Sequence, residues 1–113
     1  MINGIYTAYM TGTAGNSIAM LVLLDGKISG ADVGGGLYDG NYTELLDGKF
    51  FDGMIVFNLP SNMASISGIP PQEKPLSVNV PIHLPVEMNP EDFYRLETPI
   101  GPINLRMVKV KDL

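Results

Sequence analysis

The sequence predicts an all-β domain, and three observations lead to that class. Thirteen glycines and nine prolines are spread along all 113 residues, so turns recur at short intervals and long helices are excluded. Asp-Gly pairs, which suit the positive φ angles of hairpin turns, occur four times. Apolar and polar residues alternate over long stretches. Together these features favour a sandwich or a barrel.

Two of the Asp-Gly pairs are expected to close hairpins. Asp25-Gly26 and Asp47-Gly48 both have apolar residues on each side. This arrangement around a two-residue turn is the strongest short-range hairpin signal in a sequence. Asp39-Gly40 lies between two tyrosines and is expected to be a bend or a bulge within a strand.

The clearest alternation runs from Val78 to Met88, where every even position is apolar. Only a strand expresses a two-residue period as two faces, so His83, at an odd position, is expected to face solvent. Pro81 and Pro85 lack the N–H group on one side of this strand. The sequence therefore places the strand at a sheet edge or a barrel seam.

The alternation changes phase near the end of the chain. Ile103, Leu105 and Met107 share one face of a predicted strand, whereas Val108 and Val110 fall on the other. A strand that keeps its apolar side chains in the core needs an extra residue at such a point. We therefore expect a bulge near Met107.

Three further segments complete the expected layout. Residues 49–59 are apolar on both faces, so something must cover the second face, and a dimer partner is one candidate. Residues 61–75 contain one glycine and three prolines, which predicts a long connection. Asn89-Pro90-Glu91-Asp92 combines helix-starting features, which predicts a helix of about two turns from Pro90 to Glu97. The chain is expected to form one domain, residues 1–113.

Charge and composition exclude several classes of partner. The net charge is −5 and the seven Lys and Arg residues are scattered, so direct nucleic-acid binding is not expected. The chain has no cysteine, which removes disulfides and fits a reducing compartment. No signal peptide is seen, and the longest apolar run, residues 18–24, is too short to cross a membrane as a helix. We therefore expect a cytoplasmic protein.

No catalytic or metal-binding pattern is found. His83 is the single histidine, and no serine lies in a nucleophile-elbow context, so a Ser-His-Asp site is not expected. The calcium-loop and zinc-helix patterns are not matched, which predicts no metal site. Gly34-Gly35-Gly36 lacks the other residues of a phosphate loop and is expected to be a flexible link. The sequence thus predicts a protein that is not an enzyme and has no cofactor.

Four short motifs follow one another in an order typical of a known family. They are Asn3-Gly4-Ile5-Tyr6, then Asp25-Gly26-Lys27-Ile28 after an apolar strand, Gly30-Ala31-Asp32 and Tyr38-Asp39-Gly40-Asn41-Tyr42. Over residues 3–59 this order resembles the GrlR-like family, the bacterial negative regulators of type III secretion. The resemblance implies a lipocalin-like antiparallel β-barrel of about eight strands, a homodimer, and a transcriptional activator as protein partner. Ala31 replaces the family's second glycine, and Thr43-Glu44-Leu45-Leu46-Asp47 stands where the best-known member has an acidic run.

Two function classes remain open. The first is a regulatory protein that sequesters another protein, with Tyr38, Tyr42, Glu44 and Asp47 as expected contacts, because loops and exposed tyrosines are favoured at interfaces. The alternative for both tyrosines is that they pack on the barrel wall. The second class is a carrier of a small apolar or lipid-like ligand, because barrels of about eight strands can hold one. Seven methionines suit an adaptable pocket, although methionine also fills gaps in cores.

Overall fold

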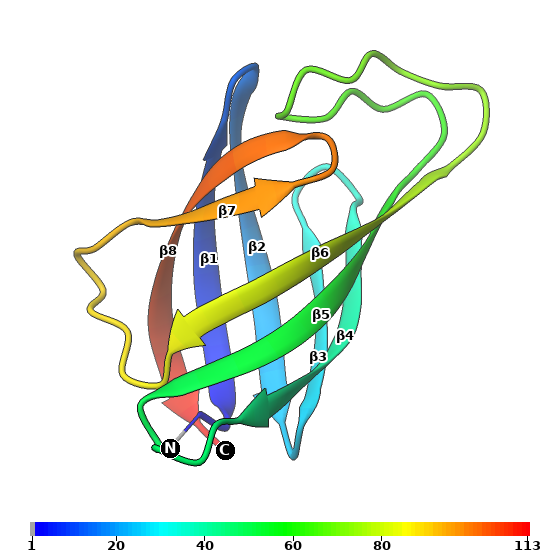
Figure 1. Ribbon diagram of the computed structural model, residues 1–113. Helices are drawn as coiled ribbons and strands as arrows, with labels where there is room; N and C mark the ends of the chain where they lie inside the picture. Colours follow the sequence, from blue (N-terminus) through cyan, green and yellow to red (C-terminus); the bar gives the residue numbers. More distant parts are fainter. Residues whose placement is uncertain (1) are drawn as a thin grey trace.

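A computed structural model describes residues 2–113 as eight antiparallel β-strands and confirms the predicted barrel (Figure 1). The strands are β1 (Gly4–Gly12), β2 (Gly15–Leu24), β3 (Lys27–Asp32), β4 (Leu37–Glu44), β5 (Phe50–Leu59), β6 (Leu76–Pro85), β7 (Tyr94–Thr98) and β8 (Gly101–Asp112). The described residues form no helix, and hence none that could span a membrane.

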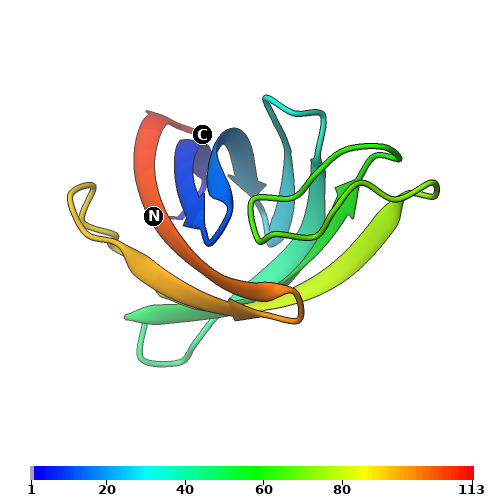
Figure 2. The same cartoon turned by 90° about the horizontal axis from the view of Figure 1, so that it is seen from above.

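One sheet with the strand order β6-β5-β4-β3-β2-β1-β8-β7 makes up the barrel. The sheet coils until its edge strands, β6 and β7, approach each other, so the barrel is nearly closed (Figure 2). No backbone ladder within residues 2–113 joins these two strands. Pro81 and Pro85 lie in β6, which confirms the predicted edge position, since the free side of an edge strand tolerates a missing N–H group.

The two predicted hairpins have different turns. Asp25-Gly26 forms the tight turn between β2 and β3, with φ angles of 50° and 83°. Positive φ at both central residues matches the twist of the flanking strands. For Asp47-Gly48 the prediction of a two-residue turn is wrong, because residues 45–49 all separate β4 from β5. There the Asp47 Oδ1 accepts the Lys49 N–H at 2.8 Å and stabilises a wider loop.

Asp39-Gly40 lies inside β4, where both neighbouring ladders keep their register, so the pair forms no bulge. The glycine is needed for space instead. A Cβ atom at Gly40 would lie 2.1 Å from the Met54 carbonyl oxygen, and one at Gly30 would lie 2.2 Å from the Met20 carbonyl oxygen. Glycine at these two positions lets adjacent strands approach closely and lets the sheet coil into a narrow barrel.

The bulge in the last strand is real but lies three residues beyond the predicted position. Ile5 and Tyr6 of β1 pair with Lys111 and Lys109 of β8, so Val110 is the extra residue. Met107 keeps the inward phase and is 3% exposed. The alternation places the bulge three residues too early because Val110, although apolar, is itself the extra residue and is 59% exposed.

The helix predicted from Pro90 to Glu97 does not form. Asn89 does start a turn: its side-chain oxygen accepts the Glu91 N–H at 2.9 Å, and its carbonyl accepts the Asp92 N–H at 3.1 Å. The chain then extends into β7, which pairs with β8. A helix of two turns is marginal by itself, so the ladder with β8 decides the conformation and overrides the local signals.

The core fills the end of the barrel at which the two chain termini lie (Figure 1). We call this end the filled half. Its side chains include Ile2, Leu23, Ile28 and Phe51, none more than 2% exposed. The ring of Phe51 meets the Tyr42 ring edge-on, with centroids 5.7 Å apart.

Asn3 connects Tyr42 of β4 to the β2–β3 turn at the base of the filled half. Its Oδ1 accepts the Tyr42 hydroxyl at 2.9 Å and the Asp25 N–H at 3.1 Å, while its Nδ2 donates to Asp25 Oδ1 at 3.2 Å. The Tyr6 hydroxyl donates to the Ile2 carbonyl at 2.6 Å. Because each buried hydroxyl here has an acceptor, the filled half combines dense apolar packing with satisfied polar groups.

The outward face of β5 is only partly covered. Phe50 stacks on the His83 ring of β6, with centroids 4.8 Å apart, whereas Met54 is 45% exposed. Apolar side chains on an outward face are thus present, as the sequence indicated. A dimer partner that covers them stays a prediction.

Candidate functional site

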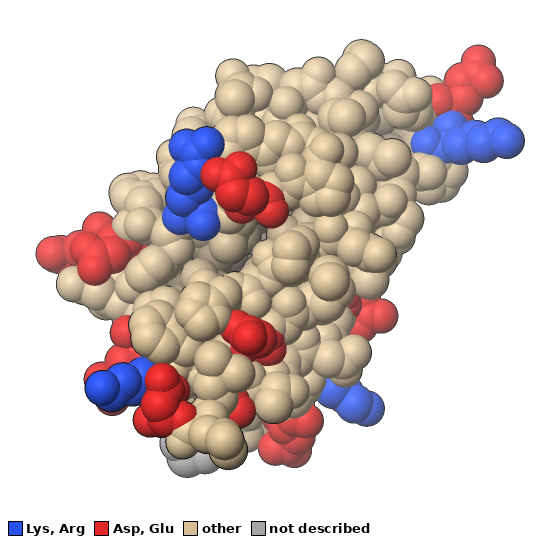
Figure 3. Space-filling view, viewed as in Figure 1, with Lys and Arg blue, Asp and Glu red and all other residues tan. Residues whose placement is uncertain are grey.

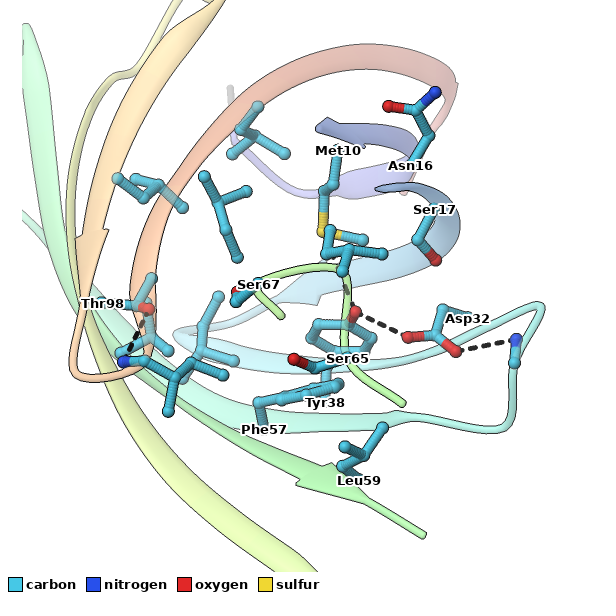
Figure 4. A pocket seen from close by; sticks show the side chains of 18 of the residues that line it. Met10, Asn16, Ser17, Asp32, Tyr38, Phe57, Leu59, Ser65, Ser67 and Thr98 are labelled. Carbon is cyan, nitrogen blue, oxygen red and sulfur yellow. Dashed lines mark hydrogen bonds between the residues drawn. The ribbon is translucent and has the colours of Figure 1, made fainter. Parts of the chain in front are cut away.

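The half of the barrel opposite the termini contains an apolar, partly open cavity of about 230 Å³. We call it the hollow half. It lies where the β1–β2, β3–β4 and β7–β8 turns meet the connection between β5 and β6 (Figures 1 and 4). Most strands contribute inward side chains to its wall, among them Met10, Leu21, Tyr38, Ile55, Phe57, Val80 and Ile103.

The connection of residues 60–75 confirms the predicted long loop and folds against the end of the cavity. It attaches to the β1–β2 turn through two hydrogen bonds. The Ala14 N–H donates to the Ile66 carbonyl at 2.7 Å, and the Thr13 hydroxyl donates to the Ser67 carbonyl at 3.1 Å. Met63, Ser65, Ile66 and Ser67 of this loop line the cavity. The site is therefore built from both the barrel wall and an ordered loop.

Ser67 leaves a polar atom without a partner at the cavity wall. Its Oγ is buried and makes no hydrogen bond within residues 2–113. Buried hydroxyl groups are nearly always hydrogen-bonded, so an exception asks for an explanation. A bound molecule with a polar group would satisfy this atom.

Asp32 and Tyr38 form the main polar group of the cavity. The Asp32 Oδ1 accepts the N–H groups of Gly34 at 3.0 Å and Gly36 at 2.8 Å, which shapes the β3–β4 turn. The Asp32 Oδ2 accepts the Tyr38 hydroxyl at 2.8 Å. Figure 4 shows that hydroxyl between Asp32 and the sulfur of Met10, which lies 3.8 Å away.

The environment of Tyr38 keeps its hydroxyl protonated. Burial, followed by the negative charge and the hydrogen bond of Asp32, raises the pKa of Tyr38 far above the usual value for tyrosine. The phenol therefore remains a donor to the carboxylate. Its ring packs against Phe57, with centroids 5.0 Å apart, and forms part of the apolar wall.

The four residues that the sequence singled out as partner contacts fall into two environments. Tyr38 lines the cavity and Tyr42 is 9% exposed in the core, so both pack on the inner wall of the barrel. Glu44 and Asp47 are exposed near the β4–β5 loop, away from the cavity. The structure thus brings Tyr38 to the site and leaves the two acids on the surface.

Sequence reasoning missed Asp32, although a signal for it exists. Asp32 precedes Gly34 and Gly36 at the spacing of an aspartate that accepts backbone N–H groups in a turn. The glycine run alone predicts a flexible link between strands. It does connect β3 to β4, but the carboxylate orders it.

A second polar group lies outside the barrel, along the gap between β6 and β7. His83 pairs with the Asp52 carboxylate, and its side chain is 59% exposed, which confirms that it faces solvent. Arg95 donates to Glu97 at 2.6 Å along β7, on one side of the gap, and Figure 3 shows a basic and an acidic side chain in contact on this face. Within the described residues, no three His, Asp or Glu side chains are grouped so that they could hold a metal ion.

Comparisons of the chain with protein-family models, with curated proteins and with solved structures find no match.

Proposed function

We propose that this barrel binds a small apolar molecule in its hollow half and that it is a binding protein without catalytic activity. The observation that carries the proposal is the apolar cavity of about 230 Å³. Protein interiors are packed as densely as organic crystals, so a space of this size is unusual in a small domain. Apolar walls with a few polar groups are also the common form of small-molecule sites.

The volume limits the size of the ligand. An engineered apolar cavity of about 150 Å³ holds benzene, whereas drug-sized ligands occupy pockets of about 300–1,000 Å³. The cavity of about 230 Å³ falls between these values. A compact molecule such as a substituted benzene or a short alkyl chain fits this range, and a long lipid chain does not.

Binding of ethylbenzene tests this function. We expect ethylbenzene to raise the melting temperature of the protein and to show saturation-transfer NMR signals. Val80→Phe places a ring in the cavity and should abolish both effects, because Val80 lines it. Asn79→Phe is the matched control, since Asn79 is exposed on the same strand and should leave binding intact. Equal binding by both variants would place the ligand outside the cavity and contradict the proposal.

A second candidate is the regulatory role implied by the resemblance, in which a cytoplasmic homodimer holds a transcriptional activator. The observation that favours it is the outward face of β2, where Ile18, Met20 and Leu24 are each more than 40% exposed. Adjacent apolar side chains on a surface are typical of protein contacts. The exposed Glu44 and Asp47 would supply acidic contacts at the rim.

Sedimentation of the purified protein tests this second candidate. A dimer is expected at micromolar concentration, and Met20→Glu should convert it to a monomer because a charge would be buried at the contact. Asn41→Glu adds the same charge to an exposed outward position of β4 and serves as the control. A wild-type protein that sediments as a monomer at all concentrations would exclude the homodimer.

A further inference from the structure

We infer that the cavity selects its ligand by charge, accepting a small apolar molecule that carries a protonated amine and rejecting the corresponding carboxylate. This inference rests on the proposed ligand-binding function and names the chemical class of the ligand. It depends on three features of the cavity wall: a single charge, a carboxylate oxygen with free acceptor capacity, and aromatic faces beside that oxygen.

Asp32 is the only charged residue in the described wall of the cavity. No Lys, Arg or His contributes to that wall. A ligand carboxylate would therefore enter an apolar space next to a like charge and would find no cation to pair with. An ammonium group would instead meet its counter-ion, and a charge that leaves water requires such a partner.

The Asp32 carboxylate retains acceptor capacity toward the cavity. A carboxylate has about four acceptor sites on its two oxygens. Within residues 2–113, Oδ1 accepts two backbone N–H groups, whereas Oδ2 accepts only the Tyr38 hydroxyl. Oδ2 can therefore accept one further donor without displacing a protein group, and a charge-assisted bond from an ammonium is the strongest choice.

Two aromatic rings lie beside this oxygen. Tyr38 and Phe57 pack at a centroid distance of 5.0 Å with an interplanar angle of 39°, and both line the cavity. The face of an aromatic ring attracts cations and repels anions. The unpartnered Ser67 Oγ also lines the cavity and offers a further acceptor for a polar group of the ligand.

Four probes of nearly equal size but different polar groups test the inference. They are 2-phenylethylamine, 2-phenylethanol, ethylbenzene and 3-phenylpropanoate, with dissociation constants measured by calorimetry or NMR titration at neutral pH. We expect the amine to bind roughly tenfold more tightly than ethylbenzene, the equivalent of one charge-assisted hydrogen bond, and the carboxylate to bind most weakly.

Asp32→Asn tests whether the charge inside the cavity, and not the overall charge of the protein, causes the preference for the amine. The asparagine oxygen can still accept the two backbone N–H groups, so the turn is preserved. Unchanged binding of ethylbenzene will show that the cavity is intact in this variant. We expect this variant to lose the preference for the amine. Asp39→Asn removes the same unit of charge from an exposed position of β4 and should keep the preference.

The outcomes distinguish the inference from the function on which it rests. If ethylbenzene binds but the carboxylate binds as well as the amine, the charge selection is wrong and the ligand-binding function stands. The same holds if Asp39→Asn lowers amine affinity as much as Asp32→Asn does. If none of the four probes binds, the proposed function fails and the inference fails with it.

Discussion

The filled half and the hollow half of the barrel are built from the same strands yet packed in opposite ways. In the filled half, inward positions carry large side chains such as Phe51, Ile28 and Leu23, each at most 2% exposed. In the hollow half, the same strands carry Ser17 on β2 and Val80 on β6 around a space of about 230 Å³. The barrel wall is continuous between the two halves, so the difference lies in how far the inward side chains fill the space that the wall surrounds.

This difference suggests that the two halves of the barrel have different roles, one in stability and the other in binding. A domain of about 110 residues has little stability to spare, so densely packed layers must hold the fold. The filled half, with Asn3 bound to Tyr42 and to the β2–β3 turn, is suited to that role. The hollow half is then free to keep a cavity and an ordered loop. Substitutions should therefore have different effects in the two halves.

The largest contrast is expected from one substitution made in each half. Ile28→Ala removes a side chain that is 1% exposed and should lower the free energy of unfolding by about 2–5 kcal/mol. Ile103→Ala enlarges an existing cavity whose wall already lacks contacts on one side, and should cost about 1 kcal/mol. Urea denaturation measures both values. Equal losses would mean that the hollow half supports the fold as much as the filled half.

Added volume should also be tolerated less well in the filled half than in the hollow half. Ala8 is fully buried, so Ala8→Val should overpack the core and destabilise by about 1–3 kcal/mol. Val80→Ile adds a methylene group that can enter the cavity, and the free energy of unfolding should change by less than about 0.5 kcal/mol. A large loss in Val80→Ile would show that the cavity walls cannot accommodate additional atoms.

The pH dependence of stability gives a further comparison, because each half contains a tyrosine with a raised pKa. Burial raises the pKa of Tyr6 in the filled half and of Tyr38 in the hollow half, but nearby Lys109 partly offsets the first shift, whereas Asp32 adds to the second. Above pH 10 the unfolded chain loses these protons while the folded chain keeps them. Stability should therefore fall by up to about 1.4 kcal/mol per pH unit for each tyrosine.

Denaturation at pH 8, 10 and 11 checks this dependence. Tyr38→Phe should reduce the loss of stability above pH 10 more than Tyr6→Phe does. The reason is that burial and Asp32 both raise the pKa of Tyr38. If stability stays constant up to pH 11, both phenols are exposed to solvent in solution.

A small effect is expected from removing one hydroxyl at the base of the barrel. Tyr42→Phe loses the bond to Asn3 Oδ1, but that oxygen still accepts the Asp25 N–H, so the loss should be about 1 kcal/mol. Ethylbenzene affinity should not change, because Tyr42 lies outside the cavity. A clear drop in affinity would show that the two halves are coupled.

Much of the fold follows from sequence patterns that depend on local geometry. The Asp25-Gly26 turn, the alternation in β6 and the edge position marked by Pro81 and Pro85 are all confirmed. Each rests on a backbone preference of the residues themselves. The errors occur where tertiary contacts decide, as at Asn89, whose helix-starting features yield one turn before β7 pairs with β8.

The candidate site was less predictable than the fold. Alternation shows which side chains face inward but gives no measure of the space between them, so the cavity could not be located. For Tyr38 the sequence leaves open a partner contact or packing on the barrel wall, and the structure places it on the wall, where it lines the cavity. Asp32 reaches the site through hydrogen bonds to Gly34, Gly36 and Tyr38, and only the first two are implied by local spacing.

The strand order also has a kinetic consequence. Within residues 2–113, every ladder joins strands consecutive in the chain except the one between β1 and β8, in which Gly4 pairs with Asp112. Closing so long a loop has a high entropic cost, and contacts distant in sequence slow folding. Docking of β8 onto β1 should thus limit the refolding rate, and Thr7→Gly on that ladder should slow stopped-flow refolding more than Ser29→Gly between β2 and β3.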